Sequence, residues 1–137
     1  MQYWLVKSEP SVWSWEQQVA KGAKGEAWTG VRNHTAKLNM MKMKKGDLAF
    51  YYHSNEGKEI VGIAEIIREH YPDPTDITGK FVCVDIKAVK PLKTPVTLAT
   101  VKTEDRLADM ELLKYSRLSV QSVTPAQWKL VCKMGGV

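Results

Sequence analysis

The sequence predicts an α+β fold with five or six β-strands and short helices at the edges of the sheet. Three observations predict it. Residues 48–53, 59–70 and 80–89 contain alternating or β-branched apolar residues typical of strands. Short helical segments carry clear start signals. Strands and helices do not alternate regularly, and no phosphate-binding glycine loop occurs, which argues against a parallel nucleotide-binding sheet.

The chain begins with a strand and a short helix. Residues 3–7 are aromatic and β-branched, which favours a strand. Ser14 and Gln17 fit a capping box for a helix over 15–21, and Gly22 ends it.

A second helix is predicted after Asn33, which is well placed as its N-cap, and it ends at Gly46. The apolar residues in this segment favour core packing over sulfur ligation. They recur at three- and four-residue spacing: Ala36, Leu38, Met40, Met41 and Met43. Four lysines lie on the outer face and at the C-terminal end of the segment: Lys37, Lys42, Lys44 and Lys45.

The middle of the chain predicts three strands joined by turns. A turn at 55–58 leads into the strand over 59–70, in which Gly62 indicates a bulge or a close backbone approach. The strand over 80–89 ends before a break at 91–95. In the strand over 48–53 one face carries Leu48, Phe50 and Tyr52, and the other carries Ala49, Tyr51 and His53.

The C-terminal part predicts two short helical pieces over 97–102 and 105–114, a strand over 117–123 and a final helix. Thr124 as N-cap and Gln127 three residues later form a capping box for that helix, with Pro125 at its first position. The apolar side of the second piece is Leu107, Met110 and Leu112 or Leu113.

The chain of 137 residues fits a single domain spanning 1–137, and its net charge is +5. The charge is uneven, because residues 1–47 hold eight Lys and Arg against four Asp and Glu, whereas 48–137 hold twelve against eleven. A positive field of this kind attracts phosphate polyanions.

Cys83 and Cys132 have no partner at metal-ligand spacing, which indicates thiols in a reducing compartment. The apolar run before Lys7 is too short for a signal peptide or a membrane span. We therefore expect a monomer without membrane attachment, located in the cytoplasm or, in a eukaryote, in the nucleus. No metal-ligand cluster or nucleophile motif appears among the His, Cys and Ser residues, so we expect no cofactor, no metal and no catalysis.

Residues 28–33, WTGVRN, combine an aromatic, a glycine, a cation and an amide, a mixture that suits a nucleobase pocket. Trp28 could stack on a base, with Tyr51 or His53 as a second wall. Gly30 would let a base approach the backbone, and Asn33 could contact its hydrogen-bonding edge. Each residue also has a structural interpretation: Trp28 as core, Asn33 as a cap, and Arg32 in a surface pair with Glu9 or Glu26.

Several segments in this order resemble the EVE domain family: YWLVKSEP, WTGVRNHTA, GDLAFYYHS, IVGIAEI, YPDPT and RLSVQSVTPAQW. The resemblance implies a PUA-like pseudobarrel, a strongly bent sheet flanked by helices. It also implies a non-enzymatic module that binds DNA or RNA and reads a modified or extruded base in an aromatic cage. Where many relatives carry a Trp before the third long strand, this chain has Phe81.

Carried over to this sequence, the resemblance implies a base pocket built from Lys7, Ser8, Trp28, Gly30, Val31, Arg32, Asn33, Tyr51, His53, Ser54, Leu118 and Ser119. The lysines at 37, 42, 44 and 45 would contact phosphates. Two alternatives remain open. The chain could be a small hydrolase of modified nucleosides, with Lys7 and Glu9 as acid and base, or a small-molecule sensor that uses the same pocket.

Overall fold

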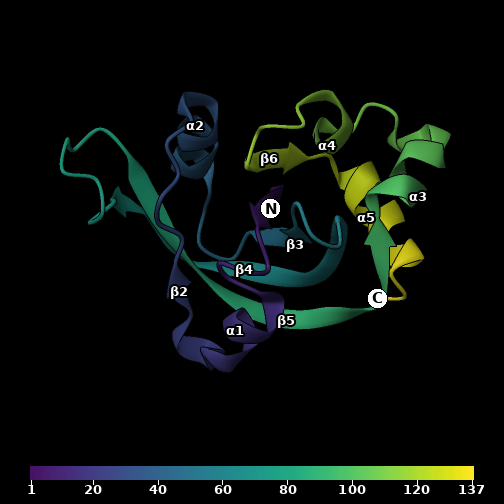
Figure 1. Cartoon of the computed structure of the whole chain (residues 1–137), viewed down its shortest axis with the longest axis horizontal. Helices are drawn as coiled ribbons and strands as arrows, with labels where there is room; N and C mark the ends of the chain where they lie inside the picture. Colours follow the sequence, from purple (N-terminus) through teal and green to yellow (C-terminus); the bar gives the residue numbers. More distant parts are fainter.

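The computed structural model describes residues 1–137 and contains one six-stranded mixed sheet in the order β2-β5-β4-β3-β1-β6 (Figure 1). The sheet is open, because its edge strands β2 and β6 do not pair with each other. The strands are β1 (Tyr3–Ser8), β2 (Glu26–Ala27), β3 (Leu48–His53), β4 (Glu59–Pro72), β5 (Val82–Thr97) and β6 (Val120–Val123).

Five short α-helices flank the sheet: α1 (Trp15–Ala20), α2 (His34–Lys42), α3 (Leu98–Thr103), α4 (Glu111–Lys114) and α5 (Pro125–Met134). Short 3₁₀ turns, Gly22–Lys24 and Asp105–Leu107, follow α1 and α3. The predicted caps are confirmed, because Ser14, Asn33 and Thr124 each accept a hydrogen bond from the backbone of the first helical turn. The α+β class is confirmed as well. No helix is long and apolar enough to cross a membrane.

The N-terminal strand lies inside the sheet. β1 pairs parallel with β3, with Tyr3 opposite Leu48 and Ser8 opposite His53, and antiparallel with β6. Because parallel neighbours need a long crossover, the segment between them, which contains α1, β2 and α2, passes over one face of the sheet. This crossover brings residues 26–33 beside the end of β1.

The two longest strands, β4 and β5, bend together, and their pairing register shifts at several points. Gly62 lies opposite Pro91 at one shift, and a Cβ at Gly62 would stand 2.5 Å from the Trp15 ring. The predicted bulge and close approach are both confirmed. The break predicted at 91–95 is wrong, because β5 continues to Thr97. Pro91 is tolerated in this strand because it lies at a register shift, where the regular ladder of backbone hydrogen bonds is interrupted.

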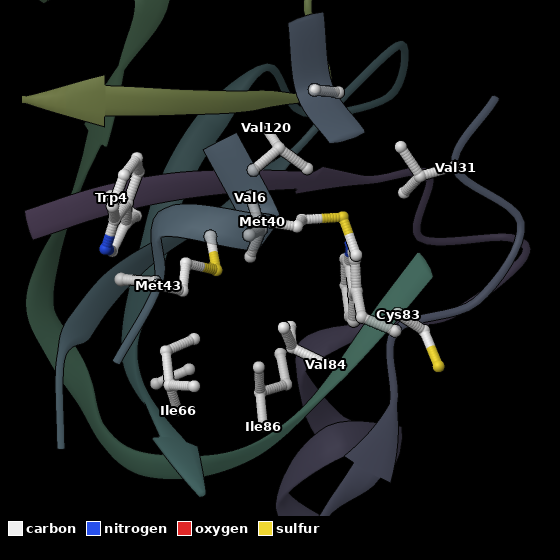
Figure 2. Packing of buried hydrophobic residues seen from close by; sticks show 14 of the residues in the cluster. Trp4, Val6, Val31, Met40, Met43, Ile66, Cys83, Val84, Ile86 and Val120 are labelled. Carbon is white, nitrogen blue, oxygen red and sulfur yellow. The ribbon is translucent and has the colours of Figure 1, made fainter. Parts of the chain in front are cut away.

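Each face of the sheet has its own core, and β3 contributes to both. Ala49 and Tyr51 point into the core beneath α2, whereas Phe50 and Tyr52 point into the core beneath α3, α4 and α5. Figure 2 shows side chains of the first core. There, α2 supplies Met40 and is followed directly by Met43, while β4 supplies Ile66 and β5 supplies Val84 and Ile86.

The apolar side of α2 is narrower than the sequence predicts. Ala36, Met40 and Met43 are buried, whereas Leu38 and Met41 are 41% and 40% exposed. Successive helical residues are separated by about 100°, so the latter two project away from the sheet.

Candidate functional site

A cavity of about 410 Å³ opens where the end of β1 meets the crossover segment. This volume lies in the range of ligand pockets. Eight of the twelve residues expected in the base pocket line it: Lys7, Ser8, Trp28, Gly30, Val31, Arg32, Asn33 and Ser119. Five further residues complete the wall: Val12, Trp13, Glu26, Ala27 and Thr29.

Asp73, which is fully buried, anchors one side of the cavity. Its carboxylate accepts hydrogen bonds from the backbone N–H of Gly30 at 2.9 Å and from Nη1 of Arg32 at 3.1 Å. The backbone N–H and the hydroxyl of Thr75 donate to its other oxygen, each at 2.7 Å. Burial by itself raises the pKa of Asp73, but the hydrogen bonds from Thr75, Gly30 and Arg32 outweigh it and hold the pKa below its ordinary value. The carboxylate therefore stays ionised and fixes the loop that carries WTGVRN.

Arg32 holds this loop in place and still presents its side chain to solvent. Its Nη2 donates to the Thr75 hydroxyl at 3.0 Å, and its guanidinium lies 5.5 Å from the centre of the Phe81 ring. The expected pairing with Glu9 or Glu26 is wrong, because Asp73 is the carboxylate within reach. The Arg32 side chain is 40% exposed. Phe81 lies beneath this cation and does not line the cavity.

Gly30 has a φ of +86°, a conformation that favours glycine, and nothing lies within 4 Å of the position a Cβ would take. The backbone is thus exposed at the cavity mouth, with open space before it.

Two tryptophans form the aromatic part of the wall. Trp28 is 8% exposed and meets Tyr51 edge-to-face, with 5.6 Å between ring centres. Trp13 is half-buried, and its indole N–H donates to Gln18 at 2.9 Å. Trp13 was not among the pocket residues predicted from the sequence. The one feature of the sequence that could have indicated a pocket residue is the position of Trp13 in the loop between a strand and a helix, because a large aromatic there is not part of an apolar strand or helix face.

Tyr51 and His53 lie behind this wall and do not line the cavity. The Tyr51 hydroxyl donates to the Trp13 carbonyl at 2.8 Å, and burial raises the pKa of this phenol far above its ordinary value. His53 Nε2 accepts from the backbone N–H of Trp15 at 3.0 Å. Both residues lie on β3, where Tyr51 is buried in the core and His53 is half-buried. Trp13 lines the cavity and these two residues do not.

Ser8 and Ser54 connect β1 with the chain beyond β3. The Ser8 hydroxyl donates to the Trp13 carbonyl at 2.7 Å, and the backbone N–H of Ser54 donates to the Ser8 carbonyl at 3.0 Å. Ser54 does not line the cavity. Leu118 is buried next to Ser119 and lines a neighbouring groove instead of this cavity.

The amide of Asn33 has two different ends. Its oxygen caps α2 by accepting from the backbone N–H of Ala36 at 2.9 Å. Its Nδ2 group has no hydrogen-bond partner within the protein, and Asn33 lines the cavity. The side chain can therefore cap the helix and donate to a ligand at the same time.

Lys7 stands at the floor of the cavity. Its ammonium donates to the Ser116 carbonyl at 2.8 Å, and burial lowers the pKa of this group. Glu9, the acid–base partner in the hydrolase hypothesis, does not line the cavity, and its carboxylate accepts from Asn55 at 2.7 Å.

The four lysines expected to contact phosphates do not gather at the cavity. Lys37 lies one turn into α2, with its ammonium 5.9 Å from the centre of the Phe81 ring. Lys42, Lys44 and Lys45 are exposed at the opposite end of the helix from Asn33.

An open, bent, mixed sheet of six strands with five short helices and a pocket at the end of β1 defines an α+β protein of the PUA-like class. The EVE domain family model matches residues 2–134, and the chain belongs to this family. The resemblance seen in the sequence is thereby confirmed.

Three relatives illustrate the similarity. Thymocyte nuclear protein 1 of Mus musculus is 31% identical over 164 residues, covering 96% of this chain and 73% of the mouse protein. The NMR structure of Rpa0253 from Rhodopseudomonas palustris is 82% identical with a TM-score of 0.95, covering 99% of this chain and 94% of that one. The human THYN1 protein, crystallised in complex with DNA containing 5-methylcytosine, is 30% identical with a TM-score of 0.90, covering 100% of this chain and 99% of that one.

Proposed function

We propose that this protein binds DNA or RNA and holds a modified base, turned out of its stack, in the cavity between β1 and the WTGVRN segment. The observation that carries the proposal is the composition of that cavity. It combines two tryptophans, a glycine without a side chain, a free amide donor and two cations.

The aromatic side chains offset the cost of extruding a base. Leaving the stack costs a few kcal/mol, and stacking on an aromatic side chain returns about 1–3 kcal/mol per base. Trp13 is the better exposed of the two tryptophans, while Trp28 presents only a small part of a ring that is otherwise packed in the core. Trp13 therefore carries most of the stacking in this proposal.

Polar groups around the aromatics match the rest of a nucleotide. The free Nδ2 group of Asn33 can donate to an acceptor on the base edge, and Gly30 leaves room for the base against the backbone. Lys7 and Arg32 supply positive charge for the adjoining phosphates. The complex of the human relative with 5-methylcytosine DNA supports the binding of nucleic acid that carries a modified base.

The test is a binding array of short DNA and RNA oligonucleotides, each with and without one modified base, and 5-methylcytosine is the first modification to include. We expect tighter binding to one modified strand than to its unmodified counterpart. Equal affinity for every matched pair would contradict the proposal.

Variants then locate the site. Trp13→Ala should weaken binding of the preferred oligonucleotide by about 1–3 kcal/mol, whereas Trp13→Phe should retain most of it because the aromatic face remains. Thr124→Ala is the control: it removes the N-cap of α5, outside the cavity, and should cost about 1 kcal/mol of stability without changing affinity.

The same samples separate the alternative functions. Mass spectrometry of the oligonucleotide after long incubation should show it intact, whereas a hydrolase would release a product. A small-molecule sensor would bind the free modified nucleoside as tightly as the oligonucleotide.

A further inference from the structure

A second concavity, of about 700 Å³, adjoins the base pocket. It lies between the start of α2 and the turn at 115–118 that leads from α4 to β6. Figure 1 shows these elements side by side, and Asn39 of α2 donates to the Val120 carbonyl of β6 at 2.8 Å beneath them. We call this concavity the side groove.

The side groove is continuous with the pocket. Asn33 lines both, and the consecutive residues Leu118 and Ser119 line the groove and the pocket respectively. Lys7, on the pocket floor, donates to the carbonyl of Ser116 in the groove wall. A nucleic-acid strand that enters the pocket can therefore continue directly into the groove.

Tyr115 is an exposed aromatic on a fixed backbone. Its side chain is 54% exposed, and it is the one aromatic among the large exposed apolar side chains. Its N–H donates to the Glu111 carbonyl at 2.8 Å, and its carbonyl accepts from Leu118 N–H at 3.0 Å and Gln121 Nε2 at 3.2 Å. The ring is thus presented to solvent on a backbone that is already held in place by hydrogen bonds.

The charges in the groove favour an anion. Arg117 is exposed and forms no ion pair and no hydrogen bond. Lys114 has only a solvent-exposed pair with Asp109, at 3.7 Å. The one carboxylate in the groove, Glu111, accepts from the backbone N–H and the hydroxyl of Ser122 at 3.0 and 2.9 Å. Two cations therefore remain for a ligand.

We propose that the side groove binds the nucleotide next to the extruded base in the same strand, with its base stacked on Tyr115 and its phosphate on Arg117. This inference rests on the proposed function and extends it, since it assigns the path of the strand. An aromatic beside a basic groove is how proteins bind single-stranded segments without reading their sequence.

The experiment measures fluorescence anisotropy with two labelled single-stranded 13-mer DNAs of one sequence, with and without a central 5-methylcytosine, and with the corresponding RNAs. Tyr115→Ala should weaken binding of both members of a pair by about 5- to 150-fold, because the groove holds a neighbour of the modified base. Tyr115→Phe should bind within about twofold of the parent, since the ring is retained.

Arg117→Ala should weaken binding of all strands and lower the log–log salt slope by about 0.7, the value of one phosphate contact on a single strand. The control, Lys93→Ala, removes the same charge from an exposed position at the far end of β5 and should change neither quantity. Circular dichroism melts verify that each variant is folded. Binding of 5-methyldeoxycytidine monophosphate should be the same in Tyr115→Ala and in the parent.

The outcomes distinguish the two proposals. Unchanged strand affinity in both Tyr115→Ala and Arg117→Ala overturns the side groove and leaves the base pocket standing. Equal binding of modified and unmodified strands by the parent, with both variants still weakened, overturns modified-base recognition in these strands while the groove remains a strand site. No binding of any strand by the parent overturns both.

Discussion

Asn33 contributes to both fold and pocket because the two ends of its amide have different partners. We expect Asn33→Asp to fold as stably as the parent, since a carboxylate also caps a helix and suits its N-terminus. The variant loses the free amide donor, so discrimination between bases should fall by about 1–3 kcal/mol. Thermal melts and the oligonucleotide array measure the two effects separately.

Asn33→Ala is the matched comparison for this prediction. It removes cap and donor together, so it should lose about 1 kcal/mol of stability as well as discrimination. If Asn33→Asp binds and discriminates as the parent does, the amide acts only as a helix cap.

The Asp73 carboxylate makes the pocket sensitive to acid. Because its pKa is held below the ordinary value of 3.8, the unfolded chain takes up this proton first as pH falls. The stabilisation is therefore full above the unfolded pKa and is lost as pH falls through the folded pKa. Asp73→Asn should cost about 1–3 kcal/mol at neutral pH, because the NH2 group that replaces one carboxylate oxygen cannot accept a hydrogen bond. Either the donors on Gly30 and Arg32 or those on Thr75 then lose their acceptor.

Urea unfolding of parent and Asp73→Asn between about pH 6 and pH 3 tests this sign. The difference in unfolding free energy between parent and variant should shrink as pH falls. The parent loses the stabilisation by the ionised carboxylate, which the variant lacks at every pH. A difference that stays constant over this range would show that the carboxylate charge does not contribute.

At the scale of secondary-structure elements, α1 packs on β4 through Trp15. Trp15 packs directly on Gly62, where a Cβ would stand 2.5 Å from its ring. Gly62→Ala should therefore destabilise the fold by about 1–3 kcal/mol, the usual cost of overpacking. Equilibrium urea unfolding measures this loss.

A double-mutant cycle with Trp15→Leu identifies the cause. If the clash with the indole is responsible, Gly62→Ala should cost less in the Trp15→Leu background than in the parent. Equal costs in both backgrounds would point to the backbone of β4 instead of the helix packing.

At the scale of the whole molecule, positive charge extends well beyond the pocket. α2 has nine residues and is roughly 14 Å long, so Lys42, Lys44 and Lys45 can reach only phosphates distant from the extruded base. We expect replacement of all three by Ala to weaken binding of every sequence alike. The log–log salt slope should fall by about 0.7–0.9 for each phosphate that these lysines neutralise in the parent.

Salt titrations of the triple variant with modified and unmodified strands test this prediction. Unchanged slopes would remove this end of α2 from the binding surface. Weakening confined to the modified strand would mean that these lysines act on the pocket and not on the backbone of the nucleic acid.

The sequence by itself determined the features that depend on short-range interactions. The caps at Ser14, Asn33 and Thr124 were predictable because each hydrogen bond closes within three residues along the chain. The alternation of β3 was predictable because the two faces of a strand follow a period of two. The order of family motifs along the chain was enough to identify the EVE domain and its α+β class.

Only the tertiary structure decided which of these residues meet. Asp73 lies 43 positions from Gly30 along the chain, and no local pattern pairs them. The parallel pairing of β1 with β3 carries the crossover past the end of β1, which puts Trp13 on the cavity wall and leaves Tyr51 behind it. Long-range pairing and burial depend on the path of the whole chain. Composition and spacing could therefore identify the candidate aromatic residues, but not which of them line the cavity and which lie in the core.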